Sequence, residues 1–308
     1  MAAYALRTVA KMALTLWLIA TIVFFATRLS GDAIDFIAPE GMDRLSRQEM
    51  IAYFGLNAPI STQYWRFLGG VVDGEFGLSL IERRPVTTIF LERVGPSLGL
   101  LLGALGLTLA VAIPAGVFAA VNRGRASAGA VMTLAFLGYA TPNFVLATLM
   151  LLIFSFWLQV MPSAGNATPL HYVMPVIALS AFYVASLTRY TRNAMLDVLG
   201  RDYLRTARAK GLPERAVILK HALRNTLVTV LSVLGLMVSG LAAAGSVVIE
   251  SVFSWRGIGD LLVTAALRRD YPVLQFGVMA VACAVVVINA LVDIAYAAVD
   301  PRVRLSKR

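Results

Sequence analysis

Residues that can act as nucleophiles, general bases or metal ligands are few in this 308-residue chain, and they lie far apart. The chain has one cysteine, Cys283, and two histidines, His171 and His221, which are fifty residues apart. A catalytic nucleophile needs a base within hydrogen-bond reach, and a metal centre needs several ligands at close spacing. The spacing of these residues indicates neither arrangement. We therefore predict that the chain is not an enzyme and binds no metal or other cofactor.

A phosphate-binding loop would be visible as a Gly-rich turn that ends in Gly-Lys-Ser/Thr, whose backbone amides and ammonium group hold the phosphates. The four lysines follow Ala10, Ala209, Leu219 and Ser306, and the sequence has no Gly-Lys pair. If ATP hydrolysis drives this protein, it therefore takes place on another chain.

One segment, 201–213, combines basic residues with the signals of a short helix that ends in a sharp turn. Asp202 can cap the start of this helix, and Arg208 suits its last turn through the helix dipole. Gly211 stands where a left-handed residue ends a helix, and Pro213 prevents continuation. The pattern predicts a rigid helix held at a corner of the chain.

This short helix has two interpretations. With small residues such as Ala207 exposed, it offers a face that the groove of a neighbouring subunit can grip. Alternatively, the segment is a solvated basic loop that binds anionic lipid headgroups. In both cases we expect a second helix over 214–224, which leads into the next apolar segment.

The elements that must position this segment are membrane helices. Hydrophobic residues make up 59% of the chain, against about 45–50% in an ordinary soluble domain, and only 14% of the residues are charged. A helix needs about 20 mostly apolar residues to cross the hydrocarbon core, and snorkelling basic residues extend a shorter segment. Suitable segments lie at 12–27, 94–122, 226–249 and 271–292, with two more within 126–188 on either side of the turn-rich residues 162–169. We predict an all-α integral membrane protein with six transmembrane helices, which excludes a disordered chain, a disulfide scaffold and a cytosolic enzyme.

The basic residues indicate which side of the membrane each connection occupies. If both termini are cytoplasmic, 17 of the 27 Lys and Arg residues lie inside: two before the first span, two at positions 123 and 125, nine over 189–224 and four over 302–308. The short connection over 162–170, on the opposite side, carries none. Because cytoplasmic loops carry an excess of Lys and Arg, we predict cytoplasmic termini. The net charge of +10 is then a topology signal and not a nucleic-acid surface, which would need interleaved aromatic residues.

This topology divides the chain into four parts. They are an N-terminal transmembrane helix (1–29), an external segment (30–93), a five-helix core (94–297) that includes the cytoplasmic segment 189–225, and a basic cytoplasmic tail (298–308).

The external segment is too small for a robust core of its own. We expect a short helix near 44–54 and turns at Gly69-Gly70 and Asp73-Gly74. Such a segment fits the docking of a partner or the covering of a gate better than a separate enzyme.

The segment after the fourth span resembles the loop motif of ABC importer permeases. Ala207, Gly211 and Leu223 match the general motif, whereas Arg205 replaces its Glu, a departure that is usual for one branch of the family. That branch transports dipeptides, oligopeptides, glutathione or nickel, and the chain is similar to it in the run Tyr203-Leu204-Arg205-Thr206-Ala207-Arg208-Ala209-Lys210-Gly211-Leu212. The similarity continues in order at 54–59, 63–64, 74–79, 221–225, 250–259, 269–272 and 300–302.

The resemblance implies the type I ABC importer permease fold, with six transmembrane helices and an external segment between the first and the second. It implies that the chain forms half of a translocation pathway in the bacterial inner membrane. The solute would be a di- or oligopeptide or a related small solute, such as glutathione or a nickel chelate.

The same resemblance implies the partners. They would be a second, homologous permease in a heterodimer, two cytoplasmic ATPases that carry ATP and Mg, an extracytoplasmic substrate-binding protein and membrane lipid, with no nucleic acid. The residues that would seat in a cleft of one ATPase are Tyr203, Leu204, Arg205, Thr206, Ala207, Lys210, Gly211 and Leu212.

The alternative is a self-sufficient proton-coupled transporter or channel, which would place ionisable groups at the bilayer centre. The one carboxylate that we expect inside a membrane helix is Asp293, which directly follows the apolar segment 271–292, about one turn before the cytoplasmic end of the last helix; a proton relay and a structural contact are both open for it.

Three candidates for an outer vestibule are Glu250, Arg256 and Asp270. Glu250 can meet a substrate there, or it can pair with Arg256 or Arg269. Because the spans are almost uncharged, we expect the substrate-binding protein to set most of the substrate range.

Overall fold

The computed structural model describes residues 2–29, 48, 51, 57–242 and 246–299. Helix is the main regular structure in these residues, and Leu78 and Pro85 form an isolated antiparallel bridge. Five helices are long and apolar enough to cross a membrane, and one strongly bent pair makes a sixth candidate. The predicted all-α membrane fold is confirmed, and the six predicted spans correspond to these five helices and the bent pair.

The chain divides into two compact units, which are residues 1–95 with 256–286 and residues 96–255 with 287–308. Two helices, α5 (Val86–Val121) and α14 (Tyr271–Val299), contribute residues to both units.

The first unit also contains α1 (Ala2–Leu29), α4 (Ile60–Asp73) and α13 (Ile258–Leu267). Aromatic rings join α4 to α1. The centroid of the Phe24 ring lies 5.3 Å from that of Tyr64 and 5.4 Å from that of Phe67. A second apolar core joins the beginnings of α5 and α14 to α13, and its buried side chains are Val86, Ile89, Phe90, Leu261, Ala265 and Val273.

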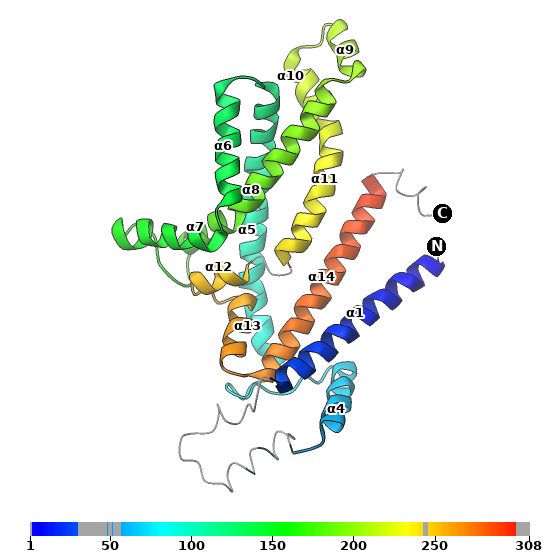
Figure 1. Cartoon of the computed structure of the whole chain (residues 1–308), viewed down its shortest axis with the longest axis vertical. Coiled ribbons are helices and arrows are strands. Elements are labelled where there is room, and N and C mark those ends of the chain that lie inside the picture. The colour runs from blue at the N-terminus through cyan, green and yellow to red at the C-terminus, as the bar shows by residue number, and fades with distance from the viewer. Residues whose placement is uncertain (1, 30–47, 49–50, 52–56, 243–245, 300–308) are drawn as a thin grey trace. The chain divides into compact units, whose positions relative to one another are not determined.

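The second unit is built around α8 (Pro169–Leu199), which has the largest set of buried side chains of the described helices. Its other elements are α6 (Ala126–Ala140), α7 (Asn143–Met150), the π-helix η1 (Leu151–Trp157), α9 (Asp202–Ala209), α10 (Glu214–Ala216), the π-helix η2 (Val217–Ala222), α11 (Leu223–Gly240) and α12 (Val247–Val252). Helices α6 and α11 pack along α8, and α9 and α10 lie at its C-terminal end (Figure 1).

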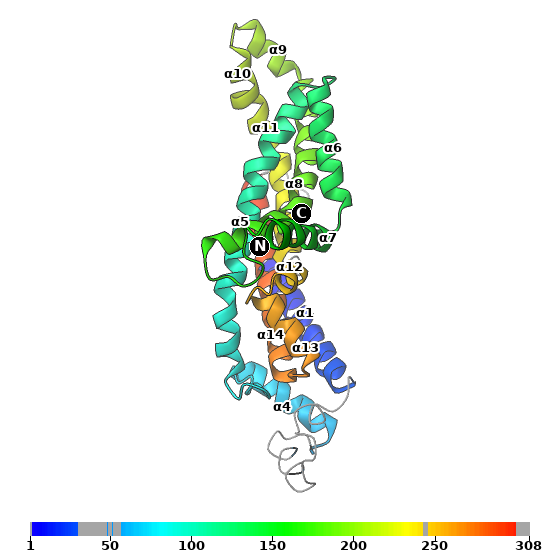
Figure 2. The same cartoon turned by 90° about the vertical axis from the view of Figure 1, so that its left-hand side faces the viewer.

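The third predicted span is not straight. Helix α6 and the combined α7–η1 helix meet at an angle of 99°, and α7 runs across the direction of α6 and α8 (Figures 1 and 2). The break falls at Thr141-Pro142, because proline has no N–H to donate and disfavours helical geometry in the residue before it. Thr141 accordingly has φ −84° and ψ 121°.

The connection before α8 gives His171 a structural role. The Thr168 hydroxyl and the His171 Nδ1 lie 2.8 Å apart, and the Thr168 N–H donates to the same nitrogen at 3.3 Å. This capping box satisfies backbone groups that the first turn of a helix leaves without partners.

Several predicted boundaries were wrong. Helix α5 begins at Val86, eight residues before the predicted span at 94–122. Helix α11 ends at Gly240, before the predicted end of the span at residue 249, and α12 begins at Val247; residues 243–245 between them lie outside the described residues. Gly69 and Gly70 lie inside α4, whereas Gly74 ends it with φ +76°, as its predicted turn requires. The helix expected near 44–54 lies outside the described residues.

Close packing of α5 against α8 depends on Gly116. A methyl group at this position would lie 2.6 Å from Thr191 Cβ and 2.8 Å from the Thr188 carbonyl oxygen, distances at which real Cβ atoms are not found. Membrane helices use small residues in this way to bring backbones together.

We therefore predict that Gly116→Ala destabilises the folded protein by about 1–3 kcal/mol, the usual cost of overpacking a filled core. The matched control is Gly106→Ala on the same helix, where nothing lies within 4 Å of the added methyl group. Thermal unfolding in detergent measures both variants. Equal unfolding temperatures for the two variants would contradict this account of the interface.

Candidate functional site

The predicted coupling residues lie at one end of the second unit, which we call the α9 end. Helix α9 follows α8 through Gly200 and Arg201, and it turns back into α10 and η2 (Figure 1). The two elements that flank α9 in the chain are therefore the ends of two candidate spans.

One face of α9 is anchored in an apolar core. Leu204 and Ala207 are three residues apart and so lie on the same side of the helix. Both side chains are buried, against Ala120 of α5, Met195 of α8, and Val217 and Ala222 of η2. Ala207 was expected to be exposed, and this prediction was wrong, because the small side chain lets α9 approach its neighbours closely.

The other face of α9 is polar, basic and aromatic. Its exposed side chains include Tyr203, Arg205 and Thr206, and Lys210 and Leu212 are exposed in the turn that follows. This is the face of α9 that is exposed in the isolated chain.

The start of α9 also differs from the prediction. Arg201 occupies the N-cap position and has no side-chain cap, while Asp202 is the first helical residue. Asp202 still favours the helix electrostatically, because a carboxylate in the first turn faces the positive end of the helix dipole. Its Oδ1 lies 3.7 Å from Arg205 Nη1.

The turn after α9 has the predicted left-handed geometry. Gly211 has φ +77°, its N–H donates to the Arg208 carbonyl at 2.9 Å, and the Leu212 N–H donates to the Ala207 carbonyl at 3.3 Å. These bonds satisfy carbonyl groups that would otherwise be left at the helix end.

Two side-chain contacts brace α9 against the next helices. Arg208 donates from Nε and Nη2 to the two carboxylate oxygens of Glu214, at 3.0 and 2.8 Å, and these bonds raise the pKa of the Arg208 guanidinium. Asn225 Nδ2 donates to the Tyr203 hydroxyl at 3.0 Å. Together with the apolar anchor, they attach α9 to both α8 and the η2–α11 helix.

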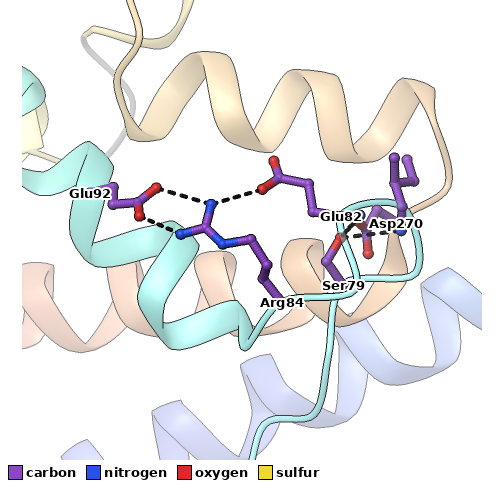
Figure 3. Close-up of polar contacts among 6 residues, drawn as sticks. Ser79, Glu82, Arg84, Glu92 and Asp270 are labelled. Carbon is purple, nitrogen blue, oxygen red and sulfur yellow. Dashed lines mark hydrogen bonds and ion pairs between the residues drawn. The ribbon is translucent and has the colours of Figure 1, made fainter.

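Of the outer candidates, Asp270 is a buried structural contact (Figure 3). It accepts hydrogen bonds from the Ser79 hydroxyl at 2.5 Å and from the Leu80 N–H at 3.1 Å. Ser79 Oγ in turn accepts from the Glu82 N–H at 2.9 Å. Asp270 therefore ties the chain before α5 to the chain before α14, although 191 residues separate Ser79 from Asp270.

The same loop carries an exposed ion-pair group (Figure 3). Arg84 contacts the carboxylate of Glu92 and lies 3.2 Å from that of Glu82. The hydrogen bond with Glu92 raises the pKa of the Arg84 guanidinium. Because all three side chains are largely exposed, water screens this group, and it contributes little to stability.

We predict that Asp270→Ala destabilises the protein by about 1–3 kcal/mol, because it leaves a buried N–H and a buried hydroxyl without partners. Asp270→Asn is the matched control, since its amide can accept from Leu80 and donate to Ser79. In detergent, wild type and the Asp270→Asn variant should both unfold at a higher temperature than the Asp270→Ala variant. A destabilised Asn variant together with a native-like Ala variant would rule out this role.

Glu250, the second outer candidate, is fully buried in α12 and accepts a hydrogen bond from the Ser97 hydroxyl at 2.7 Å. Its carbonyl accepts from the Trp255 N–H at 2.8 Å. In this conformation Glu250 is packed inside the second unit, whereas the third candidate, Arg256, is exposed in the first unit. Nearby in the first unit, burial raises the pKa of Asp260, and the charges of Arg93 and Arg256 oppose that shift.

Sequence reasoning missed Arg189. It assigned this residue to the start of the cytoplasmic segment, but Arg189 lies inside α8, about three turns before the end of the helix. Its guanidinium carbon lies 4.7 Å from the centroid of the Tyr139 ring on α6. A signal was available in the sequence, because residues 176–199 contain no Gly or Pro that would end the helix before Gly200.

Comparison with known proteins agrees with this architecture. Residues 112–305 match the family described as "Binding-protein-dependent transport system inner membrane component". The chain is 37% identical over 302 residues to the glutathione transport system permease protein GsiC of Escherichia coli (strain K12), with 98% of each chain covered. It is 38% identical over 306 residues, again with 98% of each chain covered, to the protein of the same name from Salmonella paratyphi A.

A solved structure supports the fold alone. It is described as the crystal structure of an amino acid ABC transporter with histidines, and it is 15% identical to this chain, with a TM-score of 0.51. The match covers 68% of this chain and 94% of that one. Matches over almost the full length, together with the apolar helices, show that the chain belongs to the family of binding-protein-dependent inner-membrane transport components and is a permease subunit of an ABC importer, of the peptide and nickel type.

Proposed function

We propose that this chain forms half of the translocation pathway for small peptides, glutathione or a related solute, with both termini in the cytoplasm. The observation that supports it most is α9, a short helix with an exposed Tyr203 and Arg205 and a buried anchor in two transmembrane helices. The solute class is inferred from the glutathione permeases that the chain resembles over its full length.

The proposed assembly contains a second, homologous permease, two ATPases that bind ATP and Mg, and an extracytoplasmic substrate-binding protein. This chain supplies no catalytic group and no cofactor. Large apolar side chains such as Leu134 on α6 and Leu236 on α11 are exposed in the isolated chain, and they suit contact with lipid or with the second permease.

In the proposed mechanism, the exposed residues of the 203–212 segment seat in a cleft of one ATPase. ATP-driven closure of the two ATPases moves α9. Since Leu204 and Ala207 pack on Met195 of α8 and on Val217 of η2, a displacement of α9 is transmitted to both spans. The spans then change between inward-open and outward-open arrangements.

Among the outer candidates, the structure favours different roles. Glu250 and Asp270 are buried and hydrogen-bonded to Ser97 and Ser79, whereas Arg256 is exposed and can contact a solute or the substrate-binding protein. Asp293 lies in α14, and we propose no proton relay for it.

Reconstitution tests this function. Liposomes that contain both permeases and the ATPases, with the substrate-binding protein added on the outside, should accumulate glutathione or a dipeptide only when ATP is present on the ATPase side. Omission of any one component should abolish uptake. Nucleotide-independent uptake by this chain alone, driven by a pH gradient, would instead identify a self-sufficient transporter.

A further inference from the structure

We propose that Arg189 and Tyr139 form a contact inside the translocation pathway for a carboxylate group of the transported solute. The inference rests on the proposed transport function and makes its substrate class more specific: solutes that carry a free carboxylate. Four observations within the second unit lead to it.

The first is the depth of the guanidinium along the helix. Residues 126–188 contain no Asp, Glu, Lys or Arg, so Arg189 is the first charged residue after a long uncharged segment. Helical side chains tilt towards the N-terminus of their helix, which for α8 is the end opposite α9. The contact with Tyr139, the second-last residue of α6, places the guanidinium well away from the α5–α6 connection.

The second is the absence of a counter-charge. In the described part of the chain, the Arg189 side chain has no ion pair and no side-chain hydrogen bond, and its contact is the face of the Tyr139 ring. A cation–π contact uses the face of the guanidinium and leaves its five N–H groups in the plane available. That fork is the geometry that binds a carboxylate through two parallel hydrogen bonds.

The third observation concerns the side of α8 on which the charged Arg189 guanidinium lies. Charged side chains in transmembrane segments turn towards the bundle interior or a water-filled cavity, because acyl chains cannot solvate them. Arg189 lies within the candidate span Pro169–Leu199, so by this principle the side of α8 that carries it would face water and solute and not lipid.

The fourth is a cavity beside the ring. Tyr139 also lines a cavity of about 370 Å³, together with Phe144, Phe182, Thr141 and Asn143. The rings of Tyr139 and Phe182 are stacked, with centroids 5.2 Å apart and an interplanar angle of 24°. Aromatic walls with a few polar groups are typical of small-molecule sites, and the volume suits a solute of di- or tripeptide size.

A second basic cavity in the same unit supplies a matched control. Arg125 and Arg192 line a cavity of about 420 Å³ beside the α5–α6 connection, at the α9 end. Arg125 donates to the Asn122 side chain at 3.0 Å, so its guanidinium already has a polar partner. Arg125→Gln removes one positive charge, as Arg189→Gln does, but far from the aromatic cavity.

The test uses the complete reconstituted importer with a saturating, preloaded substrate-binding protein. Two probes are compared: a dipeptide with a free C-terminal carboxylate, and the same dipeptide with a C-terminal amide. Uptake rates and ATP hydrolysis are measured for wild type, Arg189→Gln, Arg189→Lys, Tyr139→Phe, Tyr139→Leu and Arg125→Gln.

We expect Arg189→Gln to lower uptake of the carboxylate probe roughly tenfold, the range for loss of a charge-assisted hydrogen bond, with little change for the amide probe. Arg189→Lys should be intermediate, because an ammonium keeps the charge but loses the fork. Tyr139→Phe keeps the ring face that orients the guanidinium, so it should lower the preference for the carboxylate probe less than Tyr139→Leu does. Tyr139→Leu should resemble Arg189→Gln, because leucine has no ring face. Arg125→Gln should leave the ratio between the two probes unchanged.

Equal losses for both probes, or no loss in either Arg189 variant, would overturn this inference. If Arg189→Gln does not insert stably, Arg189→Lys and Tyr139→Leu still decide it through the ratio of the two probes. Failure of the proposed function is a distinct result, because the wild-type importer would then show no ATP-driven uptake of either probe.

Discussion

Replacement of Gly211 by valine is expected to reduce ATP-driven uptake by about tenfold or more, while the protein still inserts and its partner ATPases still hydrolyse ATP. Gly211 has φ +77°, a conformation that costs a residue with a side chain about 1–2 kcal/mol, and β-branched residues tolerate it least. The substitution is therefore expected to open the turn, break the bonds that end α9, and change the orientation of the face that we propose contacts the ATPase.

The control for this prediction is Gly200→Val, at the other end of the same segment. Gly200 has φ −82°, and nothing lies within 4 Å of the position that a Cβ would occupy. Valine fits there without backbone strain, so uptake should stay near the wild-type rate. Similar uptake by the two variants would show that the geometry of the Gly211 turn does not matter for coupling.

Trp255→Ala is expected to be the most destabilising single substitution considered, at about 3–5 kcal/mol, the range for truncation of a buried aromatic side chain. Trp255 is fully buried, its ring lies edge-on to Tyr172 at 4.4 Å, and its Nε1–H donates to the Pro96 carbonyl at 3.2 Å. Truncation would leave a cavity in the core that also holds Leu100 and Ile249.

Two control variants separate the parts of this effect. Trp255→Phe keeps an aromatic ring and loses the hydrogen bond to Pro96, so it should cost less than Trp255→Ala. Trp157→Ala removes a tryptophan that is 66% exposed, and it should change stability by only about 0.5 kcal/mol. Thermal unfolding in detergent ranks the three variants. A Trp255→Ala protein as stable as Trp157→Ala would contradict the packing described for this core.

Local features of this protein were predictable from the sequence because they depend on neighbouring residues. The positive φ of Gly211 follows from a glycine placed between a short basic helix and Pro213. The apolar segments were predicted because length and hydropathy are the main requirements for crossing a bilayer. The break at Thr141-Pro142 carried the same kind of local signal, but the size of the bend, 99°, depends on how α7 packs against α8.

Which residues face which neighbours was not predictable in this way. Ala207 was expected to be exposed, but it is buried. The sequence of a short helix does not show which of its sides the neighbouring helices cover. Asp270 was one candidate for an outer vestibule, and its buried hydrogen bond with Ser79, 191 residues away, could not be read from the sequence.

The sequence by itself therefore determined the class of protein, the membrane helices, the short basic helix α9 and the glycine that follows it. Each depends on composition, periodicity or the conformational preference of one residue. The tertiary structure decided the buried face of α9, the tie between Asp270 and Ser79, and the meeting of Arg189 with Tyr139 fifty positions before it. Such contacts join distant parts of the chain, and they follow only from the way whole helices pack.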